Sequence, residues 1–170
     1  MDYYLDYIFS EFSRTAMDGA EKHFTGNPDD LTVILKGHLI VEKLMRDFCM
    51  SLLPNPDHFA RAKLSFSQLI SITRALAVCP NPDVDDSWIW GAVKRLNVVR
   101  NIYAHHLEPD AEKLEEELEK LRLSLRAVEV DKEPDWAHRI SGLVGAFSTY
   151  IYLSEKVTQA SKFGRNIDGA

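Results

Sequence analysis

The stretch DSWIWGAVKRLNVVRNIYAHHLEPD, residues 86–110, decides the predicted fold of this chain. Apolar residues recur in it every three or four positions, which is the spacing that one face of an α-helix requires. These apolar positions are Trp88, Ile89, Ala92, Val93, Leu96, Val99 and Tyr103. Asp85 or Asp86 can cap the start of the helix, and Pro109-Asp110 marks its end because proline constrains the residue before it. The stretch therefore predicts one long helix.

A helical period also runs through most of the chain on either side of this stretch. We predict further helices over residues 2–24, 30–53, 66–78, 111–128 and 136–161, separated by segments rich in Pro, Asn and Asp. Very little of the chain alternates with period two, so the predicted class is all-α, a single helical bundle of five to six helices. Internal repeats and interdomain linkers are absent from the sequence, so we expect one domain over residues 1–170, with 162–170 as a polar tail.

The composition narrows the classes of protein to which the chain can belong. Its 170 residues are 45% hydrophobic, which is enough for one buried core. No window holds 18 or more uninterrupted apolar residues, and the first twelve, MDYYLDYIFSEF, carry acids where a secretory signal carries Lys or Arg. We therefore predict a cytoplasmic protein without a membrane partner.

The charge of the chain is unevenly distributed. A net charge of −6 argues against a protein that coats nucleic acid nonspecifically. The segment from Arg61 to Leu107 nevertheless holds six Lys and Arg against three Asp, a local charge of +3 that leaves −9 for the rest. A site for an anion is therefore expected in this middle third.

Several familiar kinds of site are absent from the sequence. The eight glycines form no phosphate-binding loop, and no GxSxG nucleophile turn is present. The six histidines are scattered, and no two of them lie at i, i+4 on one predicted helix, as a zinc site on a helix would need. We predict no cofactor and no metal site.

One cluster of residues that could bind a phosphate and transfer a proton remains, near the end of the helix quoted above. Its members are Arg95, Arg100, Asn101, His105 and His106. Histidine transfers protons near neutral pH, and arginine holds a phosphate with a fixed fork of donors. Together they fit cleavage of RNA by its own 2′-hydroxyl, in which a base removes the proton, a cation stabilises the phosphorane and an acid protonates the leaving oxygen. An Arg and a His near a helix C-terminus can also serve only to satisfy carbonyl groups there.

Helical geometry limits how this cluster can work. On a regular helix Arg100 and His105 lie ~140° apart, with a rise of ~7.5 Å between them. They can converge if the helix loosens near Ala104, just before the proline stop. The other route is a dimer in which two copies of the helix face each other.

The string Arg100-Asn101-Ile102-Tyr103-Ala104-His105 resembles the signature of the HEPN superfamily, an Arg, a polar residue, three further residues and a His. Two further blocks resemble the HEPN branch that includes the mannitol operon repressor family. GHLIVEKL, residues 37–44, is similar to a Gly-His-Leu…Glu stretch on its second helix. KLSF, residues 63–66, followed by LAV, residues 76–78, is similar to its third. The similarity covers about residues 31–108.

This resemblance implies a HEPN-like bundle that acts as a metal-independent endoribonuclease and usually forms a homodimer. It implies RNA as substrate, a role as a toxin or antiviral-defence effector, and an antitoxin or sensor protein as partner. By position Arg100 would bind the scissile phosphate, His105 would act as general base or acid, and Asn101 would orient His105 or contact the phosphate. The residues expected to support this site are Glu42, His38, His106 and Arg95. For Glu42 and His38, a polar contact within or between helices is the competing interpretation.

The resemblance also leaves an alternative function open. Leu107 stands where one HEPN variant carries a tyrosine that its antitoxin modifies, so that variant is not present. The mannitol repressor branch includes proteins whose name implies regulation rather than cleavage. A non-catalytic transcriptional regulator or protein-interaction module is therefore the second hypothesis, and the acidic total and the charged helix at 111–128 suit it.

Overall fold

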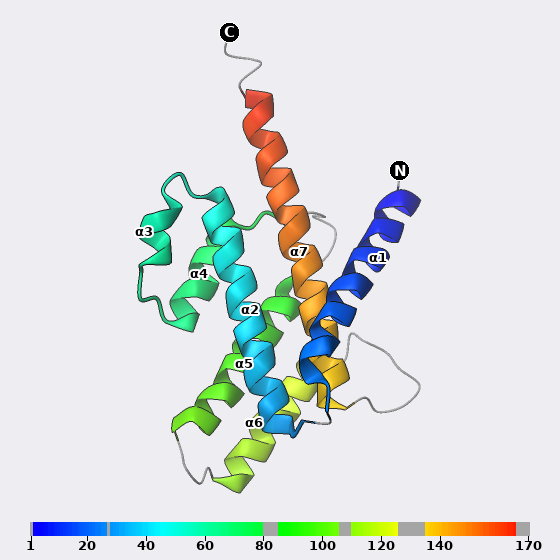
Figure 1. The fold of residues 1–170 in the computed structure, drawn as a ribbon, viewed down its shortest axis with the longest axis vertical. Coiled ribbons are helices and arrows are strands. Elements are labelled where there is room, and N and C mark those ends of the chain that lie inside the picture. Colours follow the sequence, from blue (N-terminus) through cyan, green and yellow to red (C-terminus); the bar gives the residue numbers. More distant parts are fainter. Residues whose placement is uncertain (1, 27, 80–84, 106–109, 126–134, 166–170) are drawn as a thin grey trace.

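A computed structural model of the chain describes residues 2–26, 28–79, 85–105, 110–125 and 135–165, and describes side chains within 11–104 and 110–160 of these. Seven α-helices and one 3-10 helix form in this part of the chain, and no strand does. The predicted all-α class and helical bundle are confirmed (Figure 1). The count exceeds five to six because α3 (Pro56–Ala60) is a separate helix of five residues that begins at a proline, whose fixed φ suits a first helical position.

The longer helices are separated by the segments rich in Pro, Asn and Asp that the sequence analysis names. They are α1 (Asp2–Glu21), followed by the 3-10 helix η1 (Lys22–Phe24), then α2 (Asp30–Leu52), α4 (Phe66–Leu76), α5 (Ser87–His105), α6 (Ala111–Ser124) and α7 (Trp136–Arg165). The helix α7 runs to Arg165, beyond the end near Ser161 that the sequence predicts, and residues 166–170 of the predicted tail lie outside the described residues.

Local side-chain caps explain where two of these helices begin. The Asp29 carboxylate accepts a hydrogen bond from the Thr32 backbone N–H at 2.9 Å, which satisfies one of the unpaired donors at the start of α2. At the start of α4, Ser65 and Gln68 form a capping box, in which each side chain bonds the backbone N–H of the other residue. Both starts are therefore determined by a few neighbouring residues.

The long helix α7 organises the bundle. It lies beside α1 and α2, while α2 also packs against α4 and α5, and α5 packs against α6. Figure 1 shows the C-terminal end of α7 extending past the other helices. The core between these helices is apolar, and its largest fully buried side chains include Trp90, Phe48, Phe147, Ile34, Met45 and Leu69.

Two glycines allow α1 and α2 to approach α7 closely. A Cβ atom added to Gly37 on α2 would lie 2.3 Å from Cγ2 of Ile140 on α7. A Cβ atom added to Gly145 on α7 would lie 2.7 Å from the backbone oxygen of Ser13 on α1. Both separations are far shorter than van der Waals contact, so a larger residue would require the Ile140 side chain or the α1 backbone to shift.

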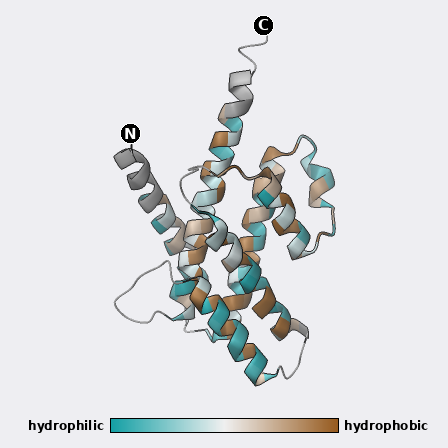
Figure 2. Ribbon diagram, turned by 180° about the vertical axis from the view of Figure 1, so that it is seen from behind, coloured by the Kyte–Doolittle hydropathy of each residue, from teal (hydrophilic) through white to brown (hydrophobic). Residues whose placement is uncertain are grey.

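The remaining helix, α6, covers one side of α5 with a charged outer surface. Its residues are mostly hydrophilic, as Figure 2 shows, and Lys120 forms ion pairs with Glu116 and Glu117 along the helix. The predicted charged helix at 111–128 forms as α6 and is amphipathic, because Leu121 is fully buried while Glu115 and Glu116 are exposed. None of the helices in the described ranges combines the length and the apolar content that a membrane span needs.

Candidate functional site

The helix α5 carries the whole Arg100–His105 motif on its last two turns. One face of α5 is buried in the core through Ile89, Ala92, Val93, Leu96 and Val99. The opposite face carries the positions of Lys94, Val98, Asn101 and His105, which recur every three or four residues. Within the motif, Asn101 and the His105 position therefore lie on the side of α5 that faces away from the core, whereas the half-buried Arg100 lies on its flank, at the border of the core face.

The helix stays regular through the end of the motif. Both Ala104 and His105 belong to α5, so the loosened turn near Ala104, one of the two routes considered above, does not occur. Arg100 and His105 consequently keep the ~140° separation of a regular helix. Asn101 and His105 are four residues apart and lie within ~40° of each other on one face.

Arg100 is partly buried and is directed toward its neighbour. Its Nη1 donates a hydrogen bond to Oδ1 of Asn101 at 3.1 Å. Because Asn101 lies between Arg100 and His105 around the helix, this bond draws the guanidinium toward the face that carries the His105 position. The side chain of His105 and the whole of His106, both predicted site residues, lie outside the described residues.

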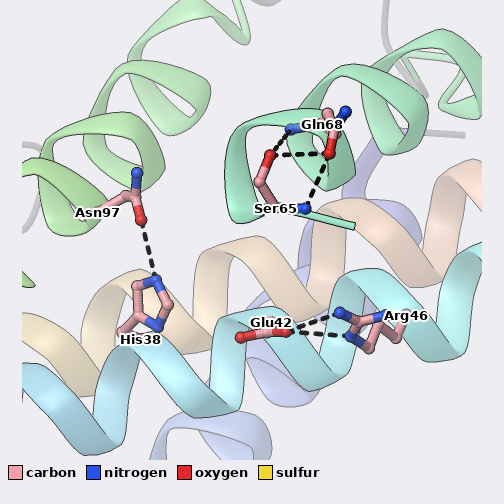
Figure 3. A network of polar contacts seen from close by, with 6 residues as sticks. All are labelled: His38, Glu42, Arg46, Ser65, Gln68 and Asn97. Atoms are coloured by element: carbon pink, nitrogen blue, oxygen red, sulfur yellow. Dashed lines mark hydrogen bonds and ion pairs between the residues drawn. The ribbon is translucent and has the colours of Figure 1, made fainter. Parts of the chain in front are cut away.

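A buried polar contact joins α5 to α2 one turn before Arg100. Nε2 of His38, which is 4% exposed, lies 3.2 Å from Oδ1 of Asn97. The imidazole ring also stacks on Phe66, the first residue of α4, with ring centroids 4.0 Å apart. Figure 3 shows Asn97 and His38 pointing toward each other from their two helices. Three helices therefore meet at His38.

The surroundings of His38 favour its neutral form. Burial lowers the pKa of His38, and the positive charge of Arg100 lowers it further. The hydrogen bond with Asn97 and the charge of Glu42 raise the pKa, without reversing the net direction. Because the Asn97 oxygen accepts the bond, Nε2 is assigned as the protonated nitrogen of a neutral ring.

We expect the chain to lose stability in mild acid because of His38. The folded-state pKa lies below the ordinary value of 6.5, so as the pH falls below about 6.5 the unfolded chain binds this proton before the folded chain does. The free energy of unfolding should therefore fall between pH 6.5 and the folded-state pKa. Urea unfolding of the wild type, of His38→Gln and of the exposed control His58→Gln at pH 7 and pH 5 measures this. An equal pH dependence in the wild type and His38→Gln would contradict it.

Two of the predicted supporting residues have partners of their own. Glu42 accepts bonds from Nε and Nη2 of Arg46, one turn along α2, at 3.1 and 3.0 Å. Arg95 forms an ion pair with Glu117 of α6 at 3.1 Å, on the other side of α5 from Asn97. Both predicted α2 residues therefore make a polar contact, within the helix for Glu42 and between helices for His38 with Asn97. Arg95 is not brought to the site.

Asn97 is the residue that sequence reasoning missed. It lies three residues before Arg100 and four before Asn101, so all three share one side of α5. The available signal was an asparagine between the core positions Leu96 and Val99, where a partly buried polar group needs a partner. That partner, His38, is 59 positions away in the chain and could not be identified from spacing.

The described residues bring together Arg100, Asn101, Asn97 and His38, with the backbone of His105 on the next turn. No group of three or more His, Cys, Asp or Glu side chains in the described ranges is placed to hold a metal ion. The arrangement offers a partly exposed cation for an anion, beside a position suited to a proton carrier. Comparisons with protein-family models, with curated proteins and with solved structures find no match to this chain.

Proposed function

We propose that the chain is a metal-independent endoribonuclease of HEPN type that works as a homodimer. The observation that carries this proposal is the continuation of α5 as a regular helix through His105, with Arg100 bonded to Asn101 on its partly exposed side. This arrangement supports a site at the border of the outer face of α5, where the Asn101 side chain links Arg100 on the flank to the face that carries the His105 position. A toxin or antiviral-defence role, and an antitoxin or sensor partner, belong to the same proposal.

In the proposed reaction the 2′-oxygen of a ribose attacks the adjacent phosphorus and the 5′-oxygen leaves. The Arg100 guanidinium holds the scissile phosphate and stabilises the charge that develops on its oxygens. His105 removes the 2′-proton or delivers a proton to the leaving oxygen. The products are a 2′,3′-cyclic phosphate and a 5′-hydroxyl, so no water or cofactor enters this step.

A homodimer can bring an Arg100 and a His105 together, which one regular helix cannot do. A phosphate on Arg100 of one copy can meet His105 of a second copy if the outer faces of two α5 helices oppose each other. Val98, a large apolar side chain that is 38% exposed, lies on this outer face. Each dimer would then hold two equivalent sites, each built from both chains.

Cleavage of RNA by the purified chain in excess EDTA tests this function. We expect 2′,3′-cyclic phosphate ends with the wild type, and no such ends with His105→Ala, while the exposed control His58→Ala cleaves normally. Mixing Arg100→Ala with His105→Ala chains should restore part of the activity, because a mixed dimer regains one complete site. Wild-type activity no greater than that of His105→Ala, across transfer, messenger and ribosomal RNA, would refute the nuclease. Failure of the mixture to recover would refute the shared site.

A second candidate function is a protein-interaction or regulatory module without catalysis. It is favoured by the acidic net charge of −6 and by the charged outer surface of α6, with its exposed Glu115 and Glu116. In the cleavage assay this candidate predicts no activity in any variant.

A further inference from the structure

Arg100 is a half-buried cation without an acidic partner. Its hydrogen bond goes to the neutral Asn101 side chain, and within the described part of the chain it forms no ion pair. Arg95 on the same helix is paired instead, with Glu117 of α6. The remaining N–H donors of the Arg100 guanidinium are therefore available for an external anion such as a phosphate.

The Asn97 side chain offers a second hydrogen-bond donor one turn earlier on α5. Its Oδ1 lies 3.2 Å from Nε2 of the buried His38, and Figure 3 shows the amide nitrogen on the side turned away from that ring. The amide nitrogen has no hydrogen-bond partner among the described residues. It is also not fully buried, because in the described ranges the one fully buried polar side-chain atom without a partner is Oγ of Ser141. The N–H₂ group of Asn97 is therefore open to solvent.

His38 fixes which end of this amide is free. A neutral imidazole whose Nε2 donates to Oδ1 of Asn97 leaves the N–H₂ group as the outward end. The ring is itself held in place by Phe66, on which it stacks with centroids 4.0 Å apart. A donor that is already oriented loses less conformational freedom when it binds a ligand. The contact between α2 and α5 thus prepares the Asn97 amide to donate outward.

Helical geometry places this amide beside the Arg100 guanidinium. Around a regular helix Asn97 is ~60° from Arg100 and ~40° from Asn101. Side chains of a helix lean toward its N-terminus, so Arg100 and Asn101 cover the turn that carries Asn97. The charge of Arg100 also lowers the pKa of His38, the partner of Asn97, which indicates that the guanidinium is near their contact. The two groups of donors therefore lie over one turn of α5.

We propose that Asn97 is a substrate-binding residue, whose amide N–H₂ donates a hydrogen bond to a non-bridging oxygen of the phosphate that Arg100 holds. This inference rests on the proposed ribonuclease function and adds a contact to the same site. A phosphodiester has two non-bridging oxygens, so the guanidinium and the amide can bind one phosphate together. Asparagine side chains commonly bind phosphate oxygens of nucleic acids in this way and fix the position of the backbone.

Three substitutions separate the free amide donor from the contact that Asn97 makes with His38. Asn97→Asp keeps an acceptor for His38 but loses the N–H₂ donor. His38→Phe loses the contact but keeps the donor, and Asn97→Ala loses both. The full chain is titrated with a fluorescent single-stranded 2′-O-methyl RNA, which cannot be cleaved because its 2′-oxygens are blocked. Urea unfolding of the same variants measures their stability.

We expect RNA affinity to follow the donor. Asn97→Ala and Asn97→Asp should bind roughly tenfold or more weakly than the wild type, as for the loss of a hydrogen bond to a charged group, and His38→Phe about threefold or less. Asn97→Asp should keep the wild-type stability, whereas Asn97→Ala should lose stability because it leaves the buried His38 without its acceptor. The control Gln68→Glu adds the same charge as Asn97→Asp but keeps the capping box of α4, and it should bind nearly as the wild type does.

Wild-type RNA affinity in Asn97→Asp, or equal losses in His38→Phe and Asn97→Ala, would overturn the inference, because Asn97 would then act only through its contact with His38. A loss in Gln68→Glu as large as in Asn97→Asp, together with wild-type affinity in Asn97→Ala, would also overturn it. The inference and the proposed function fail separately. Cleavage that depends on His105, with unchanged RNA binding in Asn97→Ala, would refute the role of Asn97 alone. The expected order of affinities without any cleavage by the wild type would refute the nuclease alone.

Discussion

Replacing Arg100 by alanine is expected to slow the proposed RNA cleavage by roughly 100- to 1000-fold, the usual cost of removing one group that stabilises transition-state charge. The guanidinium is partly exposed and its described hydrogen bond is to Asn101, the next residue. Its loss therefore removes little from the core, and the unfolding midpoint should stay close to that of the wild type. Single-turnover cleavage at saturating RNA, together with thermal unfolding, separates the two effects.

Two variants control this prediction. Arg100→Lys keeps the charge but loses the planar fork, so its rate should lie between those of the wild type and Arg100→Ala. Arg95→Ala removes an arginine of the same helix that is paired with Glu117 instead, and it should cleave at the wild-type rate. The pKa of His38, followed by NMR, should rise in Arg100→Ala because the Arg100 charge lowers it. Equal rates for Arg95→Ala and Arg100→Ala would show that Arg100 has no special role.

Replacing Trp90 by alanine is expected to lower the free energy of unfolding by ~3–5 kcal/mol, the range for a buried aromatic residue. Trp90 is 1% exposed and meets Phe147 and Tyr150 of α7 edge to face, with ring centroids 5.5 and 5.6 Å apart. Its Nε1 also donates a bond to the Asp86 carboxylate at 3.3 Å, which accepts a second bond from the Tyr150 hydroxyl at 2.7 Å. Loss of the indole would leave a cavity between α5 and α7.

The neighbouring tryptophan provides the matched control. Trp88 lies on the same helix and is only half-buried, so Trp88→Ala should cost clearly less than Trp90→Ala. Trp90→Phe keeps an aromatic ring but loses the bond to Asp86, and its stability should be intermediate. Urea unfolding of the three variants measures the order. A cost for Trp90→Ala no larger than for Trp88→Ala would contradict the packing described for α5 against α7.

Part of the candidate site could be predicted from the sequence, and part of it could not. Arg100 and Asn101 were found because their spacing on one helix is a local property. His38 was named as a supporting residue, but its neutral form and its partner Asn97 were not predicted, since both depend on α2 packing against α5. Arg95 was grouped with Arg100 because it is near in sequence, but its position on α5 places it beside Glu117 of α6.

The sequence by itself determined the helices, because apolar period, capping residues and prolines act over one or two turns. It also determined that the motif from Arg100 to His105 ends a long helix. Only the tertiary structure decided that this helix stays regular at Ala104 and that His38 is buried against Phe66. The physical reason is that such contacts join residues distant in the chain, and they depend on how helices pack rather than on any periodic pattern.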